Sequence, residues 1–338
     1  MVKFPQKVLI LTAACIALCA ANAFAQNTPV MPPNPPDTFP AVIRPEFGAA
    51  ETTERSVAVD PSVNIKLCVG EGELKINGWS RSEVRLFVKD GNAASVKVLE
   101  SNGDGGRPNW IMIRRAPRPG DPAGLGSECI SGESIALDVP TGAVLDIRGR
   151  KADVTVDSVQ KVVMKNVEGN IVLRNISGGI TAATFQGDIT AQDSSGPISL
   201  ESSTGNILAY GISSKQIGEA FRAKTTSGAI SLQKIANRQI EANSISGSVT
   251  YAGDFAGGGL YNFKTSNGSI ELKIPETSSA TFKASYGFGS FNSQIPLKIL
   301  YQEEDPPVRS LGATSGTGEA NVVLTTNSGS VVITKVEN

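Results

Sequence analysis

The sequence predicts an all-β protein, a parallel β-solenoid (β-helix) of short strands with a nine-residue half-coil beat. Three observations support this prediction. Glycine recurs every nine residues, an isoleucine follows each of these glycines by two positions, and a second apolar residue follows two positions later. A fixed period of this kind is typical of repeat folds. The glycines and isoleucines of the regular run are Gly169, Gly178, Gly187, Gly196, Gly205, Ile171, Ile180, Ile189, Ile198 and Ile207.

Each nine-residue unit is expected to be one short strand and one turn. The isoleucine and the apolar residue two positions later point to the same side of a strand, and a single unit cannot bury that side alone. Units stacked at about 4.8 Å, the spacing of paired strands, would build one continuous apolar column. Two units are expected to form one coil, because one strand and one turn cannot close around a core. A three-faced coil of longer units is the alternative.

The same apolar beat extends from Leu145 to Val331. It is interrupted at 208–220, 252–259 and 292–318, which are expected to be loops, and repeat proteins often place such insertions on a binding face. The last insertion is polar around Glu303 and is expected to be mobile. Before Leu145, short segments that alternate apolar and polar residues predict further strands.

The N-terminus predicts export. Residues 1–25 contain Lys3 and Lys7, a short apolar stretch and an Ala-Phe-Ala cleavage site, which together are typical of a signal peptide. A lipoprotein attached through Cys15 or Cys19 is the less favoured alternative. Residues 26–50 are expected to be a disordered proline-rich leader, and residues 55–338 the β-solenoid domain. No transmembrane segment is expected in the mature chain, so the product would lie in the periplasm, at the cell surface or outside the cell.

The charge balance excludes a broad electrostatic surface for nucleic acid. Removal of the signal peptide takes away two lysines and no acidic residue, which changes the counts from 31 basic and 32 acidic residues to 29 and 32, a net charge of −3. Nucleic-acid-binding domains are usually strongly basic, so no nucleic-acid partner is expected.

Two cysteines, Cys68 and Cys129, remain after the signal peptide. An even number in an oxidising compartment predicts a disulfide bond. It would close a loop of about 60 residues and contribute roughly 4 kcal/mol in the chain-entropy description. Two buried free thiols are the alternative.

The sequence predicts no enzyme. It contains no histidine, which removes Ser-His-Asp and Cys-His nucleophilic chemistry and histidine-bound metals. No phosphate-binding loop is present, and the turn glycines lack the aspartates of calcium-binding repeats, so no cofactor and no metal are expected.

Paired carboxylates are the one catalytic arrangement to consider, because glycosidases use two acids about 5–10 Å apart. The candidates are Asp153 with Asp157 and Asp188 with Asp193, but solvated acids in turns explain them better. Arg114 with Arg115 and Arg148 with Arg150 are expected to be ordinary exposed strand charges.

Trp79 and Trp110 are the only tryptophans, and both precede the regular run. An exposed pair could stack on sugar rings. A buried pair that covers the end of the solenoid is the favoured interpretation, because the open end of a repeat stack needs a cover.

Three segments give a family resemblance: 72–86, with Gly-Glu-Leu-Lys-Ile-Asn-Gly-Trp followed by Ser-Glu-Val-Arg-Leu; 135–147, with Ile-Ala-Leu-Asp-Val-Pro-Thr-Gly; and the repeated turn that ends in 326–331. They resemble the bacterial putative-adhesin β-solenoid family, an exported domain of unknown function. The resemblance covers roughly 55–338 and transfers no catalytic residue. It implies a non-enzymatic surface or envelope protein, an adhesin or scaffold that binds a cell-surface glycan or protein along the solenoid face. The alternative is a carbohydrate-active solenoid enzyme acting on polysaccharide.

Overall fold

The computed structural model describes residues 51–101, 106–117, 129–305 and 307–336. The predicted signal peptide at 1–25 and the predicted leader at 26–50 lie outside these residues. All regular elements of the described part are β-strands, most of them short, and most pairings between them are parallel. The predicted all-β class and parallel stack of short strands are therefore confirmed.

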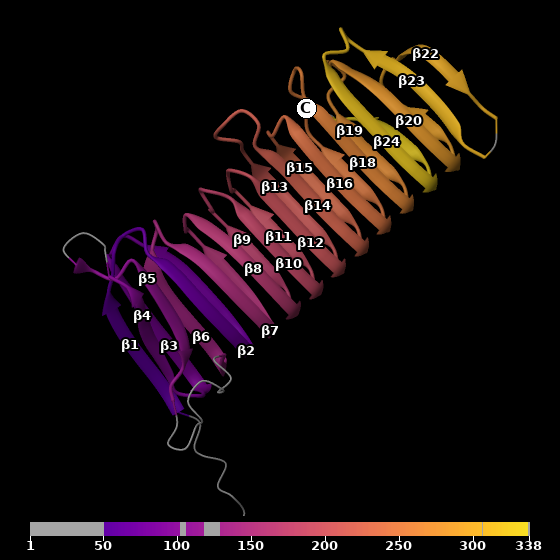
Figure 1. The fold of residues 1–338 in the computed structure, drawn as a ribbon. Helices are drawn as coiled ribbons and strands as arrows, with labels where there is room; N and C mark the ends of the chain where they lie inside the picture. Colours follow the sequence, from indigo (N-terminus) through magenta and orange to yellow (C-terminus); the bar gives the residue numbers. More distant parts are fainter. Residues whose placement is uncertain (1–50, 102–105, 118–128, 306, 337–338) are drawn as a thin grey trace, which may run out of the picture. The chain divides into compact units, whose positions relative to one another are not determined.

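The repeated strands form two walls (Figure 1). The first wall contains the strands that precede a turn glycine: β8 (Lys161–Glu168), β10 (Ile180–Gln186), β12 (Ile198–Thr204), β14 (Ala220–Ser227), β16 (Gln239–Ser246) and β18 (Leu260–Asn267). The second wall contains the strands that follow it: β9 (Ile171–Arg174), β11 (Ile189–Gln192), β13 (Ile207–Ile212), β15 (Ile230–Ile235), β17 (Val249–Ala252) and β19 (Ile270–Ile274).

Within each wall a strand pairs in parallel with the strand two places further along the chain. Ile180 of β10 lies opposite Val162 and Ile198, and Ile189 of β11 lies opposite Ile171 and Ile207. One coil therefore contains one strand of each wall. This register places like residues of successive coils in columns.

The apolar columns of both walls belong to one continuous core. Alternate residues of each strand, such as Ile171 and Leu173, are completely buried, while the residues between them face outward. Further apolar residues are buried where the second wall ends and the chain returns to the first: Val159, Ile176 and Ile212. Each coil is thus closed by two strands and one packed connection.

Glycine is required at the turn between the walls for two reasons. At Gly228 φ is +152°, a conformation that side chains disfavour, and a Cβ atom there would lie 2.1 Å from the carbonyl oxygen of Gly205 in the preceding coil. Gly205 stands in the same relation to Gly187, and Gly247 to Gly228. The coils can stack at strand spacing only because this column has no side chains.

A buried hydroxyl column runs beside the glycines. Ser202, Thr225 and Ser244 are almost fully buried. Their hydroxyls donate to the carbonyl oxygens of Gly187, Gly205 and Gly228 at 3.0, 2.9 and 2.9 Å. The repeated Ser and Thr residues are therefore explained by backbone groups that would otherwise be buried without partners.

Seven strands form the N-terminal end of the stack: β1 (Glu51–Ala58), β2 (Asn64–Trp79), β3 (Glu83–Gly91), β4 (Ala94–Glu100), β5 (Trp110–Arg115), β6 (Ile130–Pro140) and β7 (Val144–Asp157). The long strands β2 and β7 pair in parallel along their length and run through both walls. On its other side β2 pairs with β5 in its first half and with β6 in its second half. Antiparallel β4 then covers β5, while β3 and β1 follow β6.

Six strands form the C-terminal end: β20 (Ala280–Phe288), β21 (Phe291–Ser293), β22 (Lys298–Glu303), β23 (Arg309–Ser315), β24 (Ala320–Ser328) and β25 (Val331–Lys335). The last coil of the sequence, β24 and β25, is inserted between β18–β19 and β20–β21. Antiparallel β23 and β22 follow β20. The expectation of a mobile polar loop at 292–318 is wrong, because hydrogen-bonded strands that cover the end of the core occupy much of this segment.

Candidate functional site

The outward surface of the first wall carries an exposed tryptophan near its N-terminal end. Register places Asn64 of β2 opposite Trp110 of β5 on one side and opposite Val144 of β7 on the other. One step further along β2, Lys66 lies opposite Asp146 of β7. These side chains point outward because their strand neighbours, such as Ile65, are buried in the core.

The surface between these strands is an open groove of about 390 Å³. Its lining combines one large aromatic side chain with apolar, amide and charged groups: Asn64, Ile65, Lys66, Trp110, Val144, Leu145, Asp146 and Val163. Trp110 is 44% exposed, so its ring is available to a ligand. An apolar surface with a few polar groups at its margin is the usual composition of a binding site.

Trp79 differs from Trp110 in its surroundings. It is half-buried, its indole Nε1 donates to the carbonyl oxygen of Glu83 at 2.8 Å, and the Arg81 guanidinium lies 5.0 Å from the ring centre. The interpretation of two buried covering tryptophans is therefore wrong for Trp110. The two residues do not form a pair on one surface, because Trp110 lies at the start of β5 and Trp79 at the end of β2.

The predicted disulfide bond lies beside the groove. Cys68 of β2 is bonded to Cys129, which immediately precedes β6, and their Cα atoms are 4.3 Å apart. A second hollow, of about 270 Å³, is lined in part by the two cysteines, Lys66 and Arg148. Lys66 borders both hollows and precedes Cys68 by two residues in β2. The disulfide bond therefore restrains the strand next to the groove.

Basic side chains continue along the first wall from this point. Arg148 of β7 and Lys165 of β8 lie opposite each other in register and point outward. Neither forms an ion pair with any residue that the structure describes. The surface beside the groove is consequently positive.

The expectation that two pairs of arginines are exposed strand charges is correct for one pair and wrong for the other. Arg148 and Arg150 are exposed, as predicted, but Arg114 and Arg115 are half-buried. The Arg114 Nε atom is buried without a hydrogen-bond partner among the described residues. Antiparallel pairing of β4 with β5 explains the burial, because Ser95 lies opposite Arg114.

None of the four candidate acids lies in the groove. Asp153 and Asp188 accept hydrogen bonds from the backbone amides of Asn170 and Asn206, each in the next coil, at 2.8 and 2.7 Å. The carboxylates therefore join successive turns. This role has no direct signature in the sequence, although the alternation of Asp and Asn at one position of the repeat could have suggested it.

The other two acids also have local partners. Asp157 accepts from the Ser158 hydroxyl at 2.6 Å and from the Asn175 amide nitrogen at 2.9 Å. Asp193 accepts from the Gln192 amide nitrogen at 3.2 Å. These contacts support the solvated-turn interpretation over the catalytic one.

The part of the chain that the structure describes contains no cluster of metal-ligating side chains. There, no group of three or more Cys, Asp or Glu side chains is placed to hold an ion. Sequence reasoning missed the polar groove residues Asn64, Lys66 and Asp146, which meet Trp110 only through the pairing of β2 with β5 and β7.

Comparison with known proteins agrees with the predicted resemblance. Residues 196–334 match the family model of Toastrack DUF4097. No curated protein matches the chain. Among solved structures, a putative adhesin from Bacteroides fragilis is 14% identical, with 85% of this chain and 97% of that chain covered and a TM-score of 0.37.

Two further structures are similar at the same level. A putative adhesin from Parabacteroides distasonis is 11% identical, with 85% of this chain and 98% of that chain covered and a TM-score of 0.36. A putative cell adhesion protein from Clostridium sporogenes is 10% identical, with 85% and 100% covered and a TM-score of 0.26. At such scores the fold assignment depends on the strand register described above.

Proposed function

We propose that this protein is an exported, non-enzymatic envelope or surface protein that binds a glycan in the groove beside Trp110. The observation that carries the proposal is the exposed indole of Trp110 at the edge of a hollow, with Asn64, Lys66 and Asp146 around it. An exposed aromatic ring with polar groups beside it in a hollow offers both an apolar face and hydrogen-bonding groups to a ligand.

The groove has the chemistry that a sugar ring needs. The C–H face of a pyranose can pack on the flat Trp110 ring. The Asn64 amide can donate and accept hydrogen bonds, Lys66 can donate, and the Asp146 carboxylate can accept from sugar hydroxyls. Arg148 and Lys165 on the same wall favour a glycan that carries acidic groups.

Export is supported by the covalent chemistry and by the predicted signal peptide at 1–25. A disulfide between Cys68 and Cys129 is typical of proteins that fold in an oxidising compartment. No helix within the described ranges has the length and apolar character required to cross a membrane. The proposed location is the periplasm, the cell surface or the medium, with 55–338 as the folded solenoid domain.

The rival function, cleavage of a polysaccharide, lacks a supporting constellation. Asp153 and Asp188 hold backbone amides of neighbouring coils. A general acid or base would need its carboxyl group free for the substrate. Adhesion to a protein partner is the other alternative, and it is an outcome of the same test.

The test is retention of the purified protein on an array of immobilised neutral and acidic oligosaccharides, isolated cell-envelope polysaccharide and isolated cell-envelope protein. We expect selective retention, at least tenfold weaker for Trp110→Ala. Tyr210→Ala is the matched control, because Tyr210 is also exposed, at 37%, but lies in the second wall. Retention by envelope protein alone would replace the glycan with a protein partner. Release of new reducing ends from a retained polysaccharide would contradict the non-enzymatic function.

A further inference from the structure

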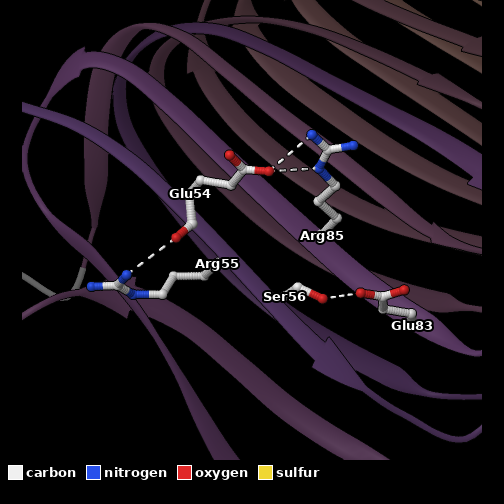
Figure 2. Close-up of polar contacts among 5 residues, drawn as sticks. All are labelled: Glu54, Arg55, Ser56, Glu83 and Arg85. Carbon is white, nitrogen blue, oxygen red and sulfur yellow. Dashed lines mark hydrogen bonds and ion pairs between the residues drawn. The ribbon is translucent and has the colours of Figure 1, made fainter.

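Two edge strands from opposite ends of the stack, β1 and β22, differ in character. At the N-terminal end β1 is polar and is tied to β3 by cross-strand contacts (Figure 2). The Arg85 guanidinium contacts the Glu54 carboxylate at 2.9 Å, and Ser56 bonds to Glu83. Arg55 donates to the Glu54 carbonyl oxygen at 3.1 Å. Charged residues on an edge strand discourage pairing with another sheet.

An edge strand at the other end, β22, is apolar at its centre. Ile299, Leu300 and Tyr301 are 48%, 54% and 46% exposed. Within the described residues β22 pairs with β23 alone, so its second edge presents backbone N–H and C=O groups without a strand partner. Three adjacent exposed apolar residues on such an edge favour addition of another strand.

The charges of β22 are complementary to those of a second, antiparallel copy of the same strand. It reads Lys-Ile-Leu-Tyr-Gln-Glu, with a cation at the first position and an anion at the last. Antiparallel pairing with an identical strand about a two-fold axis places Lys298 opposite Glu303 of the second copy and Leu300 opposite Tyr301. Opposite charges in directly facing positions stabilise a strand pair.

The side-chain directions agree with this register. Lys298, Tyr301 and Glu303 lie opposite Thr314, Gly312 and Ser310 of β23, three alternate residues on one side of that strand. A bulge at Leu300 separates the partners of Ile299 and Tyr301. The charged pair would therefore lie on one surface of the joined sheet.

Two contacts prepare this surface. The Tyr301 ring lies against Gly312, where an added Cβ would be 2.2 Å from the ring. The Ser310 hydroxyl donates to the Glu303 carboxylate at 3.1 Å, which holds that group on the same side. Lys298 has no ion-pair partner among the described residues.

We propose that β22 is a homodimer interface at which two copies of this chain join antiparallel, edge to edge, in the register of Lys298 with Glu303 of the second copy. A two-fold axis makes this contact isologous, the commonest arrangement of homodimers. The dimer would present two Trp110 grooves, which increases the apparent affinity for a repetitive surface. The interface itself does not depend on the groove's function.

A charge-swap experiment tests the register. Sedimentation equilibrium of the purified protein is expected to show a reversible dimer. Lys298→Glu and Glu303→Lys should each weaken dimerisation by about tenfold or more, since each places two like-charged pairs across the axis. The double variant Lys298→Glu/Glu303→Lys should restore the dimer to within about threefold of the original dissociation constant.

Two controls keep the result interpretable. Lys264→Glu makes the same charge change on β18, away from β22, and should leave dimerisation unchanged. Far-ultraviolet circular dichroism of each variant reports that the strands are intact. A monomer at all concentrations would overturn the proposal. A dimer that withstands both single reversals, or that the double variant fails to restore, would overturn the register and with it the β22 interface.

Discussion

At the scale of single residues, the repeat depends on columns in which one residue of each coil satisfies the backbone of the next. The Thr225 hydroxyl bonds to the Gly205 carbonyl oxygen, and the Asp188 carboxylate bonds to the Asn206 amide. A buried carbonyl group without such a partner costs about 1–3 kcal/mol. The Ser, Thr, Asn and Gly residues of these columns therefore have structural roles.

Gly228→Ala tests the glycine column. The new Cβ would meet the Gly205 carbonyl oxygen at 2.1 Å in a backbone that already disfavours side chains. We expect a loss of about 3 kcal/mol or more in the free energy of unfolding, measured by urea denaturation. Gly218→Ala is the matched control: φ there is +94°, but nothing lies within 4 Å, so only about 1 kcal/mol should be lost. Equal losses in the two variants would exclude close stacking as the reason for the column.

At the scale of elements, the insertion after β17 is fixed by an aromatic cluster. Phe255 stacks on Tyr251 with ring centres 5.4 Å apart and meets Tyr261 edge-on at 4.7 Å. The Tyr251 hydroxyl donates to the Asp254 carbonyl oxygen at 2.6 Å. The insertion at 252–259 therefore packs into the core instead of extending from it as a binding loop.

Tyr251→Phe tests the consequence for alkaline stability. Burial is the main cause that raises the pKa of the Tyr251 hydroxyl. The nearby Tyr261 and Asp254 side chains raise this pKa further. An unfolded tyrosine ionises near pH 10, so the stability that depends on the neutral hydroxyl is present below pH 10 and is lost as pH rises above it. We expect Tyr251→Phe to lose less urea resistance between pH 9 and pH 11 than the unsubstituted protein. An equal slope in Tyr251→Phe and the unsubstituted protein would contradict the role of Tyr251.

The strands of the regular run could be predicted from the sequence, because each unit repeats the same apolar and turn residues. The order of coils at the ends could not. Val322 and Val331 follow Phe282 and Phe291 in the sequence, yet their strands lie nearer the middle of the stack. Periodicity identifies which residues face inward, but it does not determine which strand lies beside which.

The groove beside Trp110 could not be predicted from the sequence either, because it depends on which strands pair. Trp110 and Asn64 are brought together by pairing of β5 with β2, across a stretch that has no repeat pattern. The tryptophan itself could be singled out as a candidate because only two are present. The exposure of the Trp110 side chain depends on which strands lie next to β5, and the sequence does not show this long-range pairing.

At the scale of the folded unit Gly48–Asn338, stability is distributed coil by coil, because each coil contacts mainly its neighbours. The N-terminal strands lack the regular turns of the later coils. The disulfide between Cys68 and Cys129 joins β2 to the start of β6 in this less regular part. It should therefore stabilise the groove end and leave the middle of the stack unaffected.

Cys68→Ser/Cys129→Ser tests this local effect. Loss of the crosslink is expected to cost about 2–5 kcal/mol in the N-terminal coils. Hydrogen exchange followed by mass spectrometry should show faster exchange in β2, β5 and β6, with β14 and β16 unchanged. Uniformly faster exchange along all the strands would show that the coils unfold together and would contradict the distributed stability.

The most direct measurement of the central claim is fluorescence titration of Trp79→Phe, in which Trp110 is the only tryptophan. The titrant is the oligosaccharide that the array retains most strongly. The account predicts a saturable blue shift of the emission, because a bound sugar would remove water from the half-exposed indole, and the same titration of Trp79→Phe/Trp110→Phe should yield no such signal. Calorimetric binding of the oligosaccharide with no change in Trp110 emission would place the glycan elsewhere and contradict the account.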